Sequence, residues 1–156
     1  MDIVRWAPTA RNMQQVKWIV INSREKMHEL AGMMIKSMKN NEKFQRQVEA
    51  WDIGKDVILR GAPALAIAYT DSEYSWGEVD STIAMQTLDL CATAMRFGTC
   101  WAGYFIALAQ NVPDIPKWLG LQSNEKIQAA LMFGYPGFEA YHRIPYRKEI
   151  DLRLIR

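Results

Sequence analysis

Apolar residues recur with two different periods along the chain, and the changes of period predict the order of its elements. Residues 16–21 form a short β-branched run and residues 64–69 a continuously apolar one, which predicts two strands. Between them, apolar residues recur every three to four positions after Ser23, which predicts a capped helix packed on the core. The apolar stripe of this helix consists of Met27, Leu30, Ala31, Met34, Ile35 and Met38. A short, more exposed helix is expected near residues 44–51.

The second half of the chain contains one long segment that is apolar on almost every face. We expect Asp80 to cap a helix over residues 81–97 and Gly98 to end it. A helix that is apolar all round needs a second surface besides its own sheet, and the pattern favours a second copy of the chain. Residues 99–104 and 126–135 predict two further strands, with a turn of helix at 115–119. The pattern therefore predicts a single α+β domain over residues 1–156, with a small mixed or antiparallel sheet flanked by helices.

Both ends of the chain carry apolar residues that lie outside these predicted elements. Residues 1–6 resemble the last turn of a helix, which suggests either a truncated chain or a naturally short form. Residues 138–156 have little periodicity, yet their apolar side chains require burial. Reaching across a dimer is one way to bury them.

Composition and charge exclude several classes of function. The chain has 156 residues, 49% of them hydrophobic, and a net charge of +2 with both signs interspersed, so a nucleic-acid-binding face is not expected. Two cysteines and two histidines argue against a disulfide framework and against a protein-ligated metal. No apolar run is long enough to cross a bilayer and no signal peptide is visible, so we expect a cytoplasmic, soluble protein.

The sequence also lacks the motifs of common catalytic side chains. It contains no Gly-x-Ser-x-Gly elbow and no glycine-rich phosphate loop, and neither histidine stands in a catalytic setting. We therefore expect no catalytic residue from the chain itself, which is typical of an enzyme whose cofactor carries the reaction.

Three segments remain as candidates for binding. Residues 7–15 form a polar turn, which is either a binding loop or an ordinary turn with local hydrogen bonds. Residues 98–104 place two glycines beside a tryptophan, which allows a flat ring to approach the backbone but also fits a β-bulge. Residues 141–148 are basic and either hold a phosphate or form a solvated tail.

Taken together, these segments resemble the nitroreductase family, and most closely its branch that is often fused to a ferredoxin domain. The similar phrases are Ala-Pro-Thr-Ala-Arg-Asn-Met-Gln-Gln at residues 7–15, Arg-Gly-Ala-Pro at 60–63 and Gly-Thr-Cys-Trp-Ala-Gly at 98–103. Gly-Tyr-Pro at 134–136 and His-Arg-Ile-Pro-Tyr-Arg at 142–147 follow in the same order.

The resemblance implies an intertwined homodimer that binds FMN between its subunits, with each site built from both chains. Pro8, Thr9 and Asn12 would touch the flavin from one subunit, and residues 100–103 would line its ring from the other. Arg147 matches the position that binds the FMN phosphate, and Arg60 or Lys55 would lie near the pyrimidine end of the ring. The implied cofactor-binding residues are Pro8, Thr9, Arg11, Asn12, Gln14, Arg60, Cys100, Trp101, Ala102, Gly103 and Arg147.

Two features depart from the family's pattern. Arg11 and Gln15 replace the usual Ser and Pro, which places a long charged side chain beside the flavin; it could help to anchor phosphate or favour anionic substrates. The family's N-terminal helix with an Arg-Arg-Ser-x-Arg signature, which grips the FMN phosphate, has no counterpart here. Its loss would weaken FMN binding.

The implied function is an FMN-dependent oxidoreductase. It would reduce nitroaromatic, quinone or similar electron-poor acceptors with electrons from NAD(P)H or a ferredoxin. One alternative is a non-catalytic dimeric binding or sensor domain that has lost its flavin. Another is a different flavin reaction, such as dehalogenation or flavin breakdown, which the loop at residues 73–78 would decide.

Overall fold

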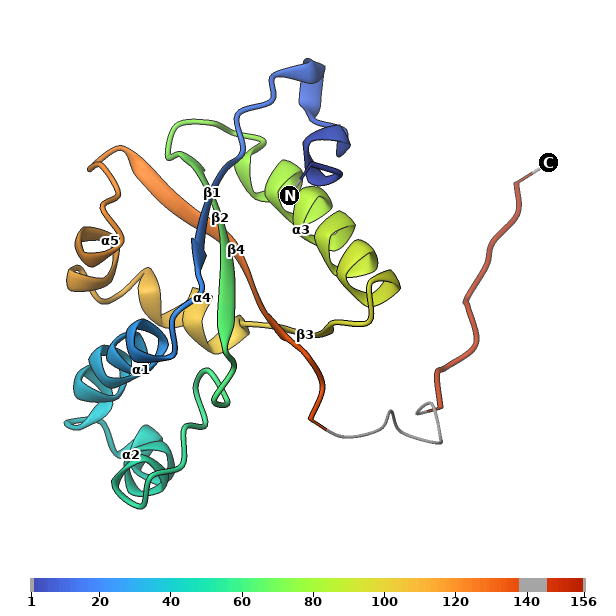
Figure 1. Ribbon diagram of the computed structural model, residues 1–156. Helices are drawn as coiled ribbons and strands as arrows, with labels where there is room; N and C mark the ends of the chain where they lie inside the picture. The colour runs from blue at the N-terminus through green and yellow to red at the C-terminus, as the bar shows by residue number, and fades with distance from the viewer. Residues whose placement is uncertain (1, 138–145, 156) are drawn as a thin grey trace.

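The computed structural model describes residues 2–137 and 146–155 and contains a four-stranded sheet with helices on both faces (Figure 1). The strands are β1 (Lys17–Ile21), β2 (Ala64–Asp71), β3 (Gly98–Trp101) and β4 (Glu125–Gly134). The α-helices are α1 (Arg24–Met38), α2 (Gln45–Asp52), α3 (Gly77–Ala94), α4 (Gly103–Ala109) and α5 (Asp114–Trp118). Three short 3₁₀ helices are η1 (Val4–Trp6), η2 (Ala10–Asn12) and η3 (Glu42–Phe44). The strand order is β1-β2-β4-β3, and every neighbouring pair is antiparallel, as the α+β prediction allows.

The two faces of the sheet carry separate cores. Leu65 and Ile67 of β2 pack against the face covered by α1, α2, α4 and α5, while Ala68 belongs to the face covered by α3. This division follows from the alternation of side chains along a strand. Since both faces are covered, β2 is buried almost throughout, which explains its continuously apolar sequence.

The predicted helix after Ser23 is confirmed. Ser23 Oγ accepts a hydrogen bond from the Lys26 amide at 3.3 Å, which is the N-cap arrangement, and α1 then runs for 15 residues. All six residues of the predicted apolar stripe are buried. The stripe therefore forms core, as its spacing indicated.

The predicted ends of the long helix are wrong. The helix α3 begins at Gly77 and ends at Ala94, so Asp80 lies within its first turn and is not the cap residue. At the other end, Arg96 adopts a left-handed conformation with φ 63°, and Gly98 begins β3. The sequence favoured Gly98 because glycine is the usual residue at a helix C-terminus, but here a non-glycine residue takes the left-handed position.

A β-bulge in β4 places the side chain of Gln128 against the start of α3. The register passes from Ala68↔Ala129 to Tyr69↔Ile127, so Gln128 has no partner opposite it. The Gln128 amide instead donates to Thr70 Oγ1 at 2.9 Å, and both side chains lie directly against Gly77.

The strand expected over residues 99–104 is shorter than predicted, because α4 begins at Gly103. This helix has only seven residues, too few to display a helical period, although Phe105 and Ala109 are buried one turn apart. Residues 146–155 contain no regular element. Their large apolar side chains are exposed, and the expected burial across a dimer stays a prediction; they are Ile150, Leu152, Leu154 and Ile155. Within the described ranges, no helix has the length and hydrophobicity needed to cross a membrane.

Candidate functional site

The turn at residues 8–14, hereafter the 8–14 turn, has a strained backbone. Arg11, Asn12 and Gln14 have φ values of 51°, 54° and 52°, in the left-handed region that non-glycine residues rarely adopt. Each such residue costs about 1 kcal/mol or more, and strain of this kind concentrates at functional sites. Within the turn, Thr9 Oγ1 accepts from the Gln14 amide at 3.1 Å, and the Gln14 side chain donates to Asn12 Oδ1 at 3.0 Å. The side chains of Pro8 and Arg11 are exposed.

A buried carboxylate joins this turn to α3. The Ala10 amide donates to both oxygens of Asp80, at 3.0 and 3.2 Å, and the Tyr74 hydroxyl donates to Asp80 Oδ2 at 2.6 Å. Asp80 is 2% exposed, and its position in the first turn of α3 favours a negative charge. The hydrogen bond to Asp80 raises the pKa of Tyr74, because that bond requires the neutral phenol.

Residues 98–103 comprise β3, Ala102 and the first residue of α4, and are called the 98–103 loop hereafter. They present backbone and mostly small side chains. The Ala102 amide donates to the Ala130 carbonyl at 2.9 Å, which fixes the loop to β4. The Thr99 hydroxyl donates to Asp89 of α3 and holds the other end. A side chain added at Gly103 would meet no atom within 4 Å, so open space faces the backbone there. Trp101 and Tyr104, which are 37% and 43% exposed, are the aromatic residues on either side of this space in the sequence.

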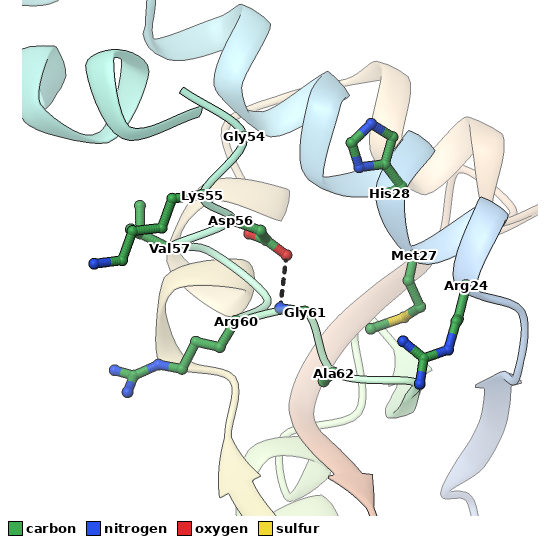
Figure 2. A pocket seen from close by; sticks show the side chains of 10 residues that line it. All are labelled: Arg24, Met27, His28, Gly54, Lys55, Asp56, Val57, Arg60, Gly61 and Ala62. Atoms are coloured by element: carbon green, nitrogen blue, oxygen red, sulfur yellow. Dashed lines mark hydrogen bonds between the residues drawn. The ribbon is translucent and has the colours of Figure 1, made fainter. Parts of the chain in front are cut away.

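Two cations lie on the loop that precedes β2. Asp56 accepts from the amides of Ile58 and Leu59 at 2.9 Å and of Gly61 at 3.1 Å, so its carboxylate shapes the loop. Figure 2 shows Lys55 and Arg60 extending from this loop in the same direction, while Arg24 of α1 lies on its other side. The open cleft between the loop and α1 has a volume of about 780 Å³.

Strand register places the start of β2 two strands away from β3. Ala64, at the start of β2, pairs with Phe133 of β4, and Thr99 of β3 pairs with the same Phe133 from the other side. Two strand spacings, about 10 Å, therefore separate the start of β2 from β3. The start of β2, four residues after Arg60, and the start of β3 therefore lie at the same end of the sheet, and residues 100–103 continue from there along the sheet.

The 8–14 turn lies at the opposite end of α3 (Figure 1). The turn is bonded to Asp80 and the 98–103 loop to Asp89, and these residues stand about 14 Å apart along the helix axis at 1.5 Å per residue. One protomer therefore does not bring the two candidate segments together. Arg147 is exposed, and no hydrogen bond or ion pair of the described residues joins it to either segment.

Sequence reasoning missed several polar contacts of this site. Asp80 stood out in the sequence only as a helix cap, since nothing in the pattern links it to a backbone amide 70 positions earlier. The bond from Gln47 Nε2 of α2 to the Tyr104 hydroxyl, at 2.8 Å, was equally invisible. Over the ranges that the structure describes, no three His, Cys, Asp or Glu residues gather as metal ligands do.

Solved structures share this fold at low sequence identity. A nitroreductase with bound FMN from Bacteroides fragilis NCTC 9343 is 18% identical, with a TM-score of 0.82 over 99% of this chain and 83% of that one. A nitroreductase with bound FMN from Desulfitobacterium hafniense DCB-2 is 21% identical, with a TM-score of 0.74 over 93% and 79% of the two chains. Iodotyrosine deiodinase bound to FMN and 3-iodo-L-tyrosine is 16% identical, with a TM-score of 0.70 over 97% and 82%.

Sequence comparison gives the family directly. A comparison with curated proteins found no match. The model of the nitroreductase family matches residues 1–135, which is most of the chain and includes both the 8–14 turn and the 98–103 loop. The chain belongs to the nitroreductase family.

Proposed function

We propose that this protein is an FMN-dependent oxidoreductase that acts as a homodimer. The observation that carries the proposal is the open space in front of Gly103, within the part of the chain that the family model matches; the resemblance to the family assigns this segment to the flavin. Similar structures that contain FMN, at 18% and 21% identity, support the same cofactor.

The residues present fit the needs of a flavin. Ala102 is buried and Gly103 has no side chain, so a flat ring can approach the backbone closely. The amides at the start of α4 have no acceptor within the helix, which leaves them free to donate to ring heteroatoms. Trp101 and Tyr104 supply apolar area that excludes water from the ring.

Charged residues are available for the two ends of the cofactor. Arg60 and Lys55 extend in the same direction, and the Asp56 carboxylate is occupied by backbone amides, so their positive charge can stabilise negative charge at the pyrimidine end of the ring. Arg147 would hold the phosphate through charge-assisted hydrogen bonds. When bound, FMN would supply the redox chemistry, taking electrons from a donor and passing them to an acceptor.

The separation of the two candidate segments supports the dimer. Because the 8–14 turn and the 98–103 loop lie at opposite ends of α3, we infer that the ring of one flavin receives them from different copies of the chain. The outer surface of α3 is apolar enough to pair with a second copy. Its exposed apolar residues are Val79, Ile83 and Leu90, followed by Met95 just after the helix, with exposures between 37% and 65%.

Electron-poor aromatic compounds such as nitroaromatics and quinones are the proposed acceptors, and NAD(P)H or a ferredoxin is the proposed donor. The proposed compartment is the cytoplasm, in keeping with the low cysteine content of the chain. The side chains that the protein contributes bind and orient the cofactor, and none of them is required to form a covalent intermediate. Substrate choice would then depend on the exposed loop at residues 72–76 and on Arg11.

The first experiment is an absorption spectrum of the purified protein, with and without added FMN, combined with its oligomeric mass. We expect oxidised-flavin bands that stay with a dimer through gel filtration. Reduction of the bound flavin by NADH, NADPH or reduced ferredoxin, followed by reoxidation with a nitroaromatic or a quinone, would then identify the donor and acceptor.

A matched pair of variants tests the phosphate contact. Arg147→Gln should weaken FMN binding and leave riboflavin binding unchanged, because riboflavin has no phosphate. Arg153→Gln removes another exposed arginine of the same segment and should change neither. A colourless dimer that cannot retain FMN would contradict the flavoenzyme and favour a non-catalytic binding or sensor domain. An FMN-loaded protein that turns over with none of the donors would contradict the reductase.

A further inference from the structure

The hydrogen bonds between the 8–14 turn and the rest of the described structure all go to a single residue, Asp80. The other hydrogen bonds of the turn are internal: Asn12 to Thr9, Met13 to Ala10, Gln14 to Thr9 and Gln14 to Asn12. The bond from the Ala10 amide to Asp80 is the one hydrogen bond that leaves the turn, within residues 2–137 and 146–155. A backbone with three left-handed residues therefore depends on one carboxylate for its placement.

The carboxylate is suited to this task by its burial and its partners. Asp80 is 2% exposed, and within the described ranges it forms no ion pair. Its charge is instead stabilised by the Ala10 amide, the Tyr74 hydroxyl and the N-terminal turn of α3. All of these are donors or positive ends of dipoles, so both oxygens of Asp80 act as acceptors.

Tyr74 brings a second segment to the same carboxylate. It lies in the loop between β2 and α3, where its own amide donates to the Asp71 carbonyl at 3.2 Å. Its hydroxyl fixes the orientation of Asp80 and so determines which way the carboxylate faces the turn. The loop at residues 72–76 and the 8–14 turn consequently share one anchor.

We propose that Asp80 is a positioning residue for the flavin, which holds the 8–14 turn in its strained conformation, and that Tyr74 orients it. This inference rests on the proposed function, since the turn is assigned to the flavin by the family motif. Asp80 itself would not touch the cofactor. It would act through the backbone of Ala10 on the exposed face of the turn.

Asparagine at position 80 would keep the shape of the side chain and lose its negative charge. Its oxygen would accept from the Ala10 amide and its nitrogen would donate to the Tyr74 hydroxyl oxygen, which can accept as well as donate, so a neutral hydrogen bond would replace the charge-assisted one that holds the turn. We expect Asp80→Asn to raise the dissociation constant for FMN about tenfold, from the loss of a charge-assisted hydrogen bond, and to change the visible circular dichroism of the bound flavin. Tyr74→Phe leaves both acceptors for Ala10 and should have a smaller effect of the same kind.

Ser23→Ala is the control for a loss of stability without a change at the turn. It removes the N-cap of α1, which covers the face of the sheet opposite to α3, and should lower the melting temperature while the dissociation constant and the flavin spectrum stay the same. A purely structural role for Asp80 predicts that Asp80→Asn behaves like this control. That result would overturn the proposal.

A second measurement needs no cofactor. In the apoprotein, the Ala10 amide should exchange slowly with solvent, and Asp80→Asn or Tyr74→Phe should speed its exchange. Fast Ala10 exchange in the wild-type protein would overturn the role of Asp80. If the wild-type protein binds no FMN, the proposed function is refuted. If the wild-type protein binds FMN and Asp80→Asn leaves the binding unchanged, only the role of Asp80 is refuted. If Asp80→Asn does not fold, the FMN dissociation constant and the Ala10 exchange rate of Tyr74→Phe test the proposal instead.

Discussion

Alanine substitution at two helical glycines should change the stability of the protein in opposite directions. At Gly77 the new Cβ would clash with Thr70 Oγ1 and lie 2.8 Å from Gln128 Nε2. At Gly32 of α1 the nearest atom would be Cζ2 of Trp51 at 3.5 Å, an ordinary van der Waals contact. The same glycine-to-alanine substitution therefore creates a steric clash in α3 and is accommodated without one in α1.

The clash at Gly77 has no easy relief. Thr70 is fully buried, and its hydroxyl is held between the Asp71 carbonyl at 3.0 Å and the Gln128 amide at 2.9 Å. Moving it breaks these bonds or shifts α3. Overpacking of this kind costs about 1–3 kcal/mol, against a gain of about 0.5–1 kcal/mol for replacing glycine in a helix. We expect Gly77→Ala to lose about 1–2 kcal/mol and Gly32→Ala to gain about 1 kcal/mol.

Thermal and urea denaturation at one fixed protein concentration would measure both effects, since unfolding of a dimer depends on concentration. The expected changes in melting temperature are about 2–4 °C for each kcal/mol in a chain of this size. A Gly77→Ala protein as stable as the wild type would refute the close packing of α3 on the bulge at Gln128. A destabilised Gly32→Ala protein would refute the helix-propensity argument used for both.

Leu90→Arg places a charge on the outer surface of α3, where the Leu90 side chain is 65% exposed. It should convert the proposed dimer to a monomer in sedimentation velocity, while the far-ultraviolet circular dichroism stays unchanged. A dimer of undiminished affinity would contradict the proposed interface. Gly103→Ala has open space for its Cβ in the apoprotein and should not lower the melting temperature, but it should abolish FMN retention, and normal FMN binding would place the flavin elsewhere. The hydrogen bond from Lys17, at 2.7 Å, lowers the pKa of Glu125, so its contribution to stability is present above the unfolded pKa of about 4.3 and is lost as the pH falls through the folded value. Glu125→Gln should therefore reduce the loss of stability between neutral and acidic pH in urea titrations, and an unchanged acid limb would show that this ion pair does not contribute.

Local patterns predicted much of the fold. The α1 stripe, the Ser23 cap and the buried strand β2 depend on residues close together in sequence, and the structure confirms them. The predicted start of α3 was wrong because aspartate is a typical N-cap residue, whereas the Asp80 carboxylate accepts a hydrogen bond from the distant Ala10 amide. Helix α4 was missed because seven residues are too few to show a period.

The candidate site was predictable only as separate segments. Motif order identified the 8–14 turn and the 98–103 loop, but their separation by the length of α3 depends on strand pairing that no local pattern reveals. The left-handed residues Arg11, Asn12 and Gln14 were equally hidden, since only asparagine among them is common in that conformation. Contacts between residues distant in sequence account for what the sequence left out.

The opposite placement of the two segments along α3 also determines how defects combine in a mixed dimer. If one chain is damaged in the 8–14 turn and the other in the 98–103 loop, one flavin site receives both damaged segments and the other receives neither. Two chains that are each inactive as homodimers would then form a heterodimer with one intact site. In the proposed homodimer, activity would therefore depend on the pair of chains, because each flavin site would take one segment from each of them.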